Sequence, residues 1–132
     1  MENLNLPTLK VLILTGNLIK HIDGLEETNS LSELILQKNE ITELNYLGLP
    51  PEFPSLSKLD CSYNKIPLEY FEELCKILQN LPALSELDLT GNEITLQKYY
   101  KYNIIQAKKN LKILDNMEIK GFVKQHIEVG KK

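Results

Sequence analysis

An eleven-residue pattern of hydrophobic and polar positions recurs along the chain. Its clearest copy begins at Leu84 and has leucine at its first, fourth and sixth positions, asparagine at the ninth and isoleucine at the eleventh. Equivalent copies begin at Leu9, Leu31 and Leu56, and a shortened copy begins at Leu111. The alternation of apolar and outward positions is typical of a short strand. Because one copy cannot bury its own leucines, the copies are expected to stack and close a continuous core.

The asparagine of each copy has a predicted structural role. It turns the chain out of the strand, and its side-chain amide can satisfy backbone groups at the turn and bridge neighbouring copies. Gly16 and Gly91 directly precede their asparagine and are assigned to the same turn. The third copy has Cys61 where the others have leucine, and a free cysteine packs as a small hydrophobic side chain.

The repeated pattern resembles the leucine-rich repeat family. The first copy, with Ile22 and Leu25 at its further apolar positions, is similar to the short 22-residue subclass typified by the regulatory subunit of protein phosphatase-1. Thr28 stands where that subclass prefers leucine. The resemblance implies an α/β fold, namely a right-handed solenoid. We expect about four or five short parallel strands on its concave face, with irregular loops and helices on its convex face.

The chain is expected to form a single leucine-rich repeat domain over residues 1–132, with repeats starting at residues 9, 31, 56 and 84. Pro67 and the helical spacing from Phe71 to Leu78 predict a convex-side helix over 68–79. A second helix is predicted over 96–109. Three prolines between positions 48 and 54 exclude a helix there and predict an extended connection.

The segment at about 96–119 is similar to the C-terminal cap of intracellular short-repeat proteins. Tyr100-Lys101 and the later Leu111 to Asp115 carry this resemblance. The chain departs from the cap pattern at Lys101, which replaces arginine, and at Lys108-Lys109, which replaces Leu-Pro. The tail, 120–132, follows the cap. The apolar residues expected to pack back on the last layer are Ile119, Phe122, Val123, Ile127 and Val129.

The first eight residues contain only Leu4, Leu6 and Pro7 as candidate capping positions, which is too little for a helical cap. An uncapped solenoid exposes an apolar layer and a strand edge. Three interpretations remain open. The chain is a piece of a longer array, its N-terminal edge self-associates, or Leu4 and Leu6 form a minimal cap.

Composition narrows the class of protein. A net charge of −3 and 42% hydrophobic residues are typical of a globular domain and show no chain-level footprint of nucleic-acid binding. No apolar run approaches the roughly 18 residues that a membrane span requires, and residues 1–5 do not resemble a secretory signal. Cys61 and Cys75 fall in a core position and on a predicted helix, which favours reduced thiols and an intracellular, cytoplasmic protein.

No residue pattern indicates an enzyme, a cofactor or a metal site. His21 and His126 are far apart, and the chain has no phosphate loop, nucleophile elbow or paired-cysteine spacing. Basic and aromatic residues alternate in Lys98-Tyr99-Tyr100-Lys101-Tyr102, as they do in some nucleic-acid binders. Helical spacing turns some of these tyrosines toward the last core layer, however, so we do not expect nucleic-acid binding.

The concave strand positions are the predicted partner-binding site, because they alternate with the buried leucines and form rows along the solenoid. Asp60, Asp88 and Asp115 share a row and, at a strand spacing of about 4.8 Å, are expected to form a carboxylate ladder that suits a Lys- or Arg-bearing partner. The alternative is that aspartate simply suits this exposed position. A metal site is not expected, because evenly spaced open carboxylates do not close a coordination shell. The candidate residues are Val11, Ile13, Glu33, Ile35, Lys58, Asp60, Tyr63, Glu86, Asp88 and Asp115.

The leading hypothesis is a non-catalytic protein–protein interaction module that binds a basic, or mixed basic and apolar, partner on its concave face. Family analogy suggests phosphatase regulation, attachment to axonemal dynein motors or assembly of a spliceosomal particle, and it slightly favours a ciliary or cytoskeletal scaffold. The alternative hypothesis is a structural segment of a longer array or multiprotein assembly, with no recognition role of its own. Neither hypothesis involves a membrane.

Overall fold

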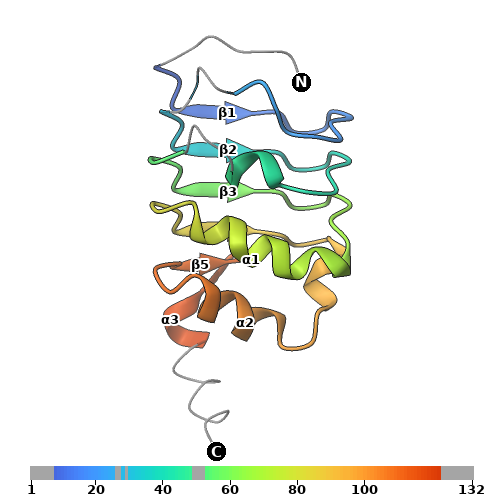
Figure 1. Cartoon of the computed structure of the whole chain (residues 1–132), viewed down its shortest axis with the longest axis vertical. Helices are drawn as coiled ribbons and strands as arrows, with labels where there is room; N and C mark the ends of the chain where they lie inside the picture. The colour runs from blue at the N-terminus through green and yellow to red at the C-terminus, as the bar shows by residue number, and fades with distance from the viewer. Residues whose placement is uncertain (1–7, 26–27, 29, 49–52, 123–132) are drawn as a thin grey trace, which may run out of the picture.

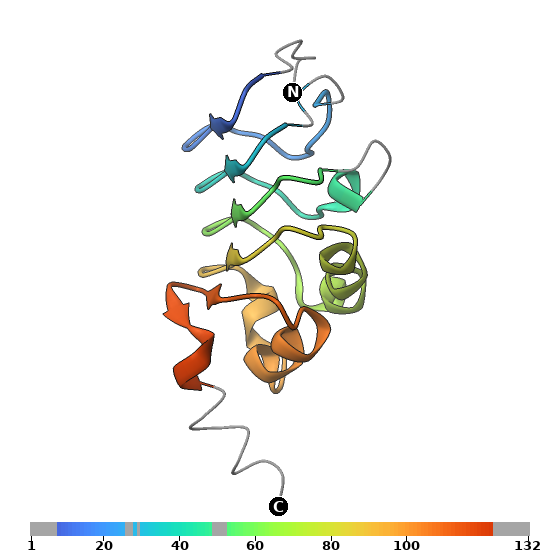
Figure 2. The same ribbon diagram turned by 90° about the vertical axis from the view of Figure 1, so that its left-hand side faces the viewer.

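The repeats stack along one axis, with a sheet on one side and the helices on the other (Figure 1, Figure 2). The computed structural model describes residues 8–25, 28, 30–48 and 53–122. Each repeat contributes one short strand and returns through a loop or helix on the opposite side. This is the α/β solenoid that the spacing of the leucines predicts.

The sheet has six strands, which follow one another in chain order. Five are parallel, and the sixth runs antiparallel to its neighbour. The strands are β1 (Val11–Ile13), β2 (Glu33–Ile35), β3 (Lys58–Asp60), β4 (Glu86–Asp88), β5 (Ile113–Leu114) and β6 (Met117–Glu118).

The five parallel strands confirm the predicted four or five, and the antiparallel strand β6 is an addition that was not predicted. Asp115 and Asn116 join β5 to β6 with φ angles of 51° and 66°, and Leu114 pairs directly with Met117. Two consecutive residues with positive φ make the tight turn whose twist matches an antiparallel hairpin. The last strand therefore turns back on the sheet, and Ile119 is buried as expected, at 6% exposure.

The asparagine ladder predicted from the repeats is confirmed. Asn64 shows the pattern: its Nδ2 donates to the Leu36 and Cys61 carbonyls (2.9 and 3.0 Å), and its Oδ1 accepts from the Ile41 amide (2.9 Å). Asn39 and Asn92 make the equivalent bonds in their repeats. Each asparagine thus closes its own turn and ties it to the preceding repeat. These bonds satisfy backbone groups that the strand leaves unpaired.

The core is a continuous column of leucine and isoleucine between the sheet and the convex side. Cys61 replaces a leucine in this column and is fully buried, as predicted. Thr28 is also fully buried, and its hydroxyl donates to the Leu25 carbonyl (2.9 Å). A buried threonine is acceptable there because its polar atom is paired locally.

The convex side is helical mainly in its C-terminal half (Figure 1). Its longer helices are α1 (Phe71–Gln79) and α2 (Tyr100–Ala107). The shorter turns are η2 (Asn45–Gly48), η3 (Leu68–Tyr70), η4 (Glu93–Leu96) and α3 (Ile119–Phe122). The segment from η3 through α1 confirms the helix predicted over 68–79.

The helix predicted over 96–109 is wrong at both ends. Tyr99 has φ 58° and separates η4 from α2, and Leu96 is 76% exposed rather than packed on a helix face. At the other end, α2 stops at Ala107 and Lys108 has a non-helical φ of −137°. Lys108 is only 7% exposed, although lysine side chains are usually exposed to solvent.

Three predictions fall on residues or side chains outside the described ranges. These are the N-terminal cap or open edge at 1–8, for which only residue 8 is described, the proline-rich connection at 49–52, and the side-chain packing of Phe122, Val123, Ile127 and Val129 in the tail. In the described part of the chain, no helix has the length and apolar character needed to cross a bilayer.

Candidate functional site

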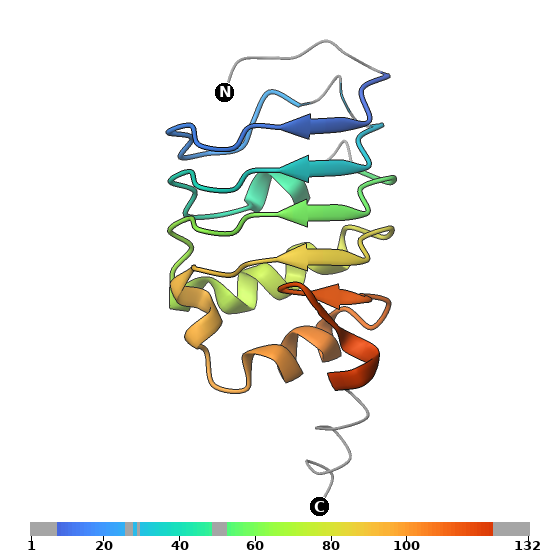
Figure 3. The same ribbon diagram turned by 180° about the vertical axis from the view of Figure 1, so that it is seen from behind.

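Eight of the ten predicted site residues lie on the strands that Figure 3 shows in front of the helices. We call this side of the sheet the open face. They form two rows in register, since the strands that carry them are direct neighbours. One row is Val11, Glu33, Lys58 and Glu86; the other is Ile13, Ile35, Asp60 and Asp88. Tyr63 follows β3 and Asp115 follows β5.

The N-terminal half of the open face is apolar. Ile13 is 62% exposed and Val11 is 41% exposed, and Ile35 lies beside Ile13 on the next strand. Side chains of this kind are placed in water at a cost, and they are typical of surfaces that a partner covers. The strand positions between them hold the core leucines, so these three side chains are surplus to the packing of the fold.

The middle of the open face is acidic, but its carboxylates are not equivalent. Asp60 is only 9% exposed, and its Oδ1 accepts from the Ser62 amide and hydroxyl (3.0 and 2.7 Å). Asp88 accepts from the Thr90 amide through Oδ1 (3.0 Å) and from Asn116 Nδ2 through Oδ2 (2.9 Å). The predicted neighbours Asp60 and Asp88 are paired in register, and each also stabilises the turn that follows its strand.

Asp115 departs from the predicted ladder. Its Oδ1 accepts from the Leu89 amide (2.7 Å), and its Oδ2 lies 3.4 Å from Lys101 Nζ. Its side chain is 8% exposed. The carboxylate therefore binds the backbone after β4 and helix α2, and Lys101 already compensates its negative charge. The expected three-carboxylate ladder is a two-carboxylate patch.

Three lysines around this patch are already paired with other acids. Lys58 Nζ lies 3.6 Å from Glu86 on the next strand, Lys65 lies 3.6 Å from Glu40, and Lys101 binds Asp115. Within the described residues, no salt bridge reaches Asp60 or Asp88. These two carboxylates consequently leave a local negative charge on the open face.

The turns after β1 to β4 lie one above another along one edge of the sheet (Figure 3). Their equivalent residues, just before each asparagine, are Gly16, Lys38, Tyr63 and Gly91, with φ of 75°, 59°, 55° and 79°. We call this line of residues the turn edge. A left-handed conformation suits glycine and costs another residue about 1–2 kcal/mol. Lys38 and Tyr63 therefore occupy a position whose backbone favours glycine.

Tyr63 is the most exposed aromatic ring beside the acidic patch, at 54% exposure. A Cβ placed on Gly91 would lie 2.4 Å from its Cδ1 and 2.8 Å from its Cε1. The ring thus rests on the Gly91 backbone, which is open to it only because that residue has no side chain. An alignment of the four repeats shows from sequence alone that tyrosine stands at position 63 where two other repeats have glycine. The contact of its ring with Gly91 is seen only in the structure.

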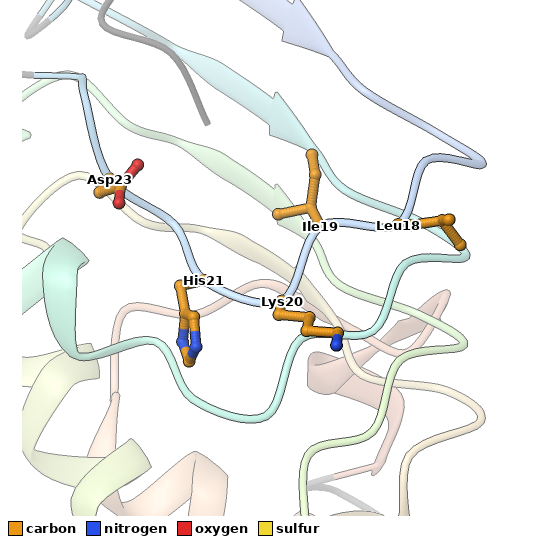
Figure 4. Close-up of a pocket in the computed structure, with 5 residues that line it drawn as sticks. All are labelled: Leu18, Ile19, Lys20, His21 and Asp23. Atoms are coloured by element: carbon orange, nitrogen blue, oxygen red, sulfur yellow. The ribbon is translucent and has the colours of Figure 1, made fainter.

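The hollows lined by described residues are shallow, and the one after β1 lacks convergent chemistry. One, of about 480 Å³, is lined by Leu18, Ile19, Lys20, His21 and Asp23, all from one loop after β1. Figure 4 shows that these five side chains leave the loop in different directions rather than meeting at one point. His21 lies 3.0 Å from Glu43. Among the described residues, no three His, Cys, Asp or Glu side chains gather as a metal site.

The cysteines are poor nucleophiles. Burial raises the pKa of the Cys61 thiol, and the charges of Asp60 and Asp88 raise it further. Burial likewise raises the pKa of Cys75, with Glu72 adding to the effect. Both are free thiols, and a raised pKa keeps each in the less reactive protonated form.

Tyr100, Lys101 and Asp115 lie together at the C-terminal end of the described solenoid, while the assignment of this segment as a family cap stays a prediction. Tyr100 is 5% exposed, confirming that part of the Tyr-Lys run faces the core, whereas Tyr99 is 69% exposed. Burial raises the pKa of the Tyr100 phenol, and the Asp115 charge adds to this. Burial lowers the pKa of Lys108, which stands where the cap pattern has leucine.

Comparison with known proteins bears on the fold. No family model matches the chain, and no curated protein matches its sequence. A chain in the crystal structure of the Drosophila melanogaster SNF/U2A′ complex superposes with a TM-score of 0.71 at 20% identity, covering 99% of this chain and 84% of that chain. An internalin (inlF) from Listeria monocytogenes gives a TM-score of 0.48 at 23% identity, over 76% of this chain and 32% of that chain. The first likeness confirms the leucine-rich repeat fold, while the short-repeat subclass stays a prediction.

Proposed function

We propose that the chain is a non-catalytic protein-binding module whose open face holds a partner with both apolar and basic side chains. One observation carries the proposal: exposed apolar residues and carboxylates that lack a cation lie in register on the same strands. Ile13 and Ile35 lead along one row directly into Asp60 and Asp88. A complementary partner covers the apolar half and supplies cations to the acidic half.

The likeness to a chain from the SNF/U2A′ complex supports a role within a multi-component assembly, because that chain was crystallised with a named companion. Phosphatase regulation and a ciliary or cytoskeletal scaffold rest on family analogy alone. Binding rather than catalysis is favoured by the shallow hollows and by the protonated, buried Cys61 thiol.

Comparative affinity capture tests the role of the open face. The chain is used as bait beside Ile13→Glu, which places a charge on the apolar half at a 62% exposed position. The matched control is Leu96→Glu, the same chemical change at a 76% exposed apolar residue of η4. We expect a captured protein to be lost with Ile13→Glu and retained with Leu96→Glu.

Charge is tested by Asp88→Asn, because asparagine keeps an oxygen for the Thr90 amide while removing the negative charge. Its control is Glu72→Gln, an exposed acid on α1. Partners retained equally by Ile13→Glu, Asp88→Asn and both controls would contradict the open-face proposal. That result would favour the alternative of a structural segment without a recognition role.

A further inference from the structure

We propose that Tyr63, together with Asp60 and Asp88, is the seat for an arginine side chain of the protein partner. The inference rests on the proposed function, because it assigns one specific contact to the basic half of that partner. It commits to arginine rather than lysine and to a protein rather than a nucleic acid.

The Tyr63 ring is held in position by its own backbone and by Gly91. The Tyr63 amide donates to the Thr90 carbonyl (2.7 Å), and the ring rests on Gly91. One side of the ring thus lies against backbone, and more than half of the side chain stays exposed, at 54%. A ring held in this way offers a fixed aromatic surface to a ligand and loses little freedom when it binds.

Hydrogen bonds hold the Asp60 and Asp88 carboxylates against the turns that carry Tyr63 and Gly91. Asp88 binds the Thr90 amide, one residue before Gly91, so its carboxylate and the ring lie at the two ends of the Thr90-Gly91 peptide. Asp60 binds Ser62, directly before Tyr63. An aromatic surface and two acids consequently occupy one corner, where β3 and β4 end.

The nearby lysines do not form salt bridges with the Asp60 and Asp88 carboxylates in the described part of the chain. Lys58, Lys65 and Lys101 are each bound to an acid other than these two. Lys38, on the previous repeat, has no salt bridge to Asp60 or Asp88 within the described part of the chain. The corner therefore lacks a cation of its own and is complementary to one from a partner.

The choice of arginine follows from shape. Guanidinium is planar, so it can stack on a tyrosine ring while its edge donates to a carboxylate, and it is less strongly hydrated than ammonium. Asp60 Oδ2 has no donor among the described residues, and it is the available acceptor on β3. A nucleic acid would instead bring phosphates toward two carboxylates, which repel them.

The turn-edge backbone supplies an internal control. Because φ at position 63 is 55°, Tyr63→Gly removes the ring and also relieves the left-handed strain. Tyr63→Asn removes the ring with a second residue that tolerates this conformation. Lys38→Gly makes the same backbone change at the equivalent position, where φ is 59°.

The experiment selects binders from a displayed library of random 12-residue peptides, using the intact chain as the target. Enriched peptides are synthesised, and their Kd values are measured against each variant. We expect the peptides to share an arginine whose replacement by lysine or alanine weakens binding about tenfold, the size of a partly desolvated cation–π contact. Tyr63→Gly and Tyr63→Asn should weaken binding about tenfold, whereas Lys38→Gly should leave it unchanged or tighter.

Urea unfolding of the same variants separates recognition from structure. We expect Tyr63→Gly to unfold at the wild-type midpoint or above it. A lower midpoint for both Tyr63 variants would show that the ring is a structural clamp and overturn the proposal. Peptides that lack arginine, or that bind Tyr63→Gly as well as wild type, would overturn it too.

Further outcomes show whether the arginine seat, the open-face function or both proposals are wrong. If the peptides lose binding to Ile13→Glu but not to the Tyr63 variants, the open-face function stands and the arginine seat is wrong. If no peptide distinguishes Ile13→Glu from wild type, both proposals fail. Binding of oligouridylate that is lost in Tyr63→Gly would replace arginine with a stacked base.

Discussion

Asn64 is expected to be among the most sensitive polar positions in the chain, because its side chain joins two repeats inside the core. The change is Asn64→Ala. It removes three donated bonds, to the Leu36, Cys61 and Ser62 carbonyls, and the bond accepted from the Ile41 amide. All of these are buried.

The magnitude follows from which groups stay unpaired. The Leu36 carbonyl also accepts from Asn39, and the Cys61 carbonyl also accepts from Asn92. The Ile41 amide has no second acceptor among the described residues. One buried unpaired donor costs about 1–3 kcal/mol, and the lost bonds add about 1 kcal/mol, for a total of about 2–4 kcal/mol.

Urea denaturation followed by circular dichroism measures this loss. With an m-value of about 2 kcal/mol/M, the midpoint should fall by roughly 1–2 M without a change in m. The matched control is Asn17→Ala, because Asn17 is exposed, makes one bond to the Leu14 carbonyl, and shares that carbonyl with Asn39. We expect it to cost less than about 0.5 kcal/mol. Equal losses at the two positions would refute the argument, since the inter-repeat bond would then contribute nothing measurable.

Two other predictions concern the convex side. Lys108→Leu is expected to raise the free energy of unfolding by about 1–2 kcal/mol, because it replaces a 7% exposed lysine whose pKa is lowered by burial. The control is Lys109→Leu, the same change at an exposed lysine. An equal gain in stability at position 109 would contradict the packing argument. Burial, with Glu43 and Glu73, raises the pKa of Tyr70 to about 12, against a lowering by its bond to the Leu44 backbone. The unfolded tyrosine ionises near pH 10, so the folded state holds more protons between pH 10 and 12 and stability falls across that window. Thermal melts should show a smaller fall in Tyr70→Phe, and an unchanged slope would contradict the assignment.

Much of the fold could be predicted because leucine and asparagine positions make the same contacts in every repeat. What escaped prediction depends on single backbone angles. Asp115 and Asn116 both adopt positive φ and create the β5–β6 hairpin, and Tyr99 does so and shortens the cap helix. Asparagine and aspartate tolerate that conformation, which gives a weak sequence signal at the hairpin. Tyrosine does not favour it, so the break at Tyr99 carries no comparable sequence signal.

The strand register of the candidate site could be predicted from the sequence. The hydrogen bonds and ion pairs that its carboxylates make could not. Alternation and repeat spacing place Asp60 beside Asp88 without any structure. Which carboxylates face a partner depends on local turns, where Asp60 binds Ser62 and Asp88 binds Thr90. An aspartate two residues before serine or threonine is a recognisable turn pattern. The contact of Asp115 with Lys101 instead joins the last strand to the cap helix, and no repeat period foretells it.

The open face and the core are under different physical constraints, which is why the former can indicate function. Leu34 is fully buried and any change there creates a cavity or a clash. Ile13, directly after the strand leucine Leu12, is 62% exposed, so a polar residue would serve the fold equally well. The same holds for Tyr63, whose backbone would be more relaxed with glycine. The fold does not require these apolar and aromatic side chains, and they lie on one face beside acids that lack a cation. We infer that they contact a partner protein.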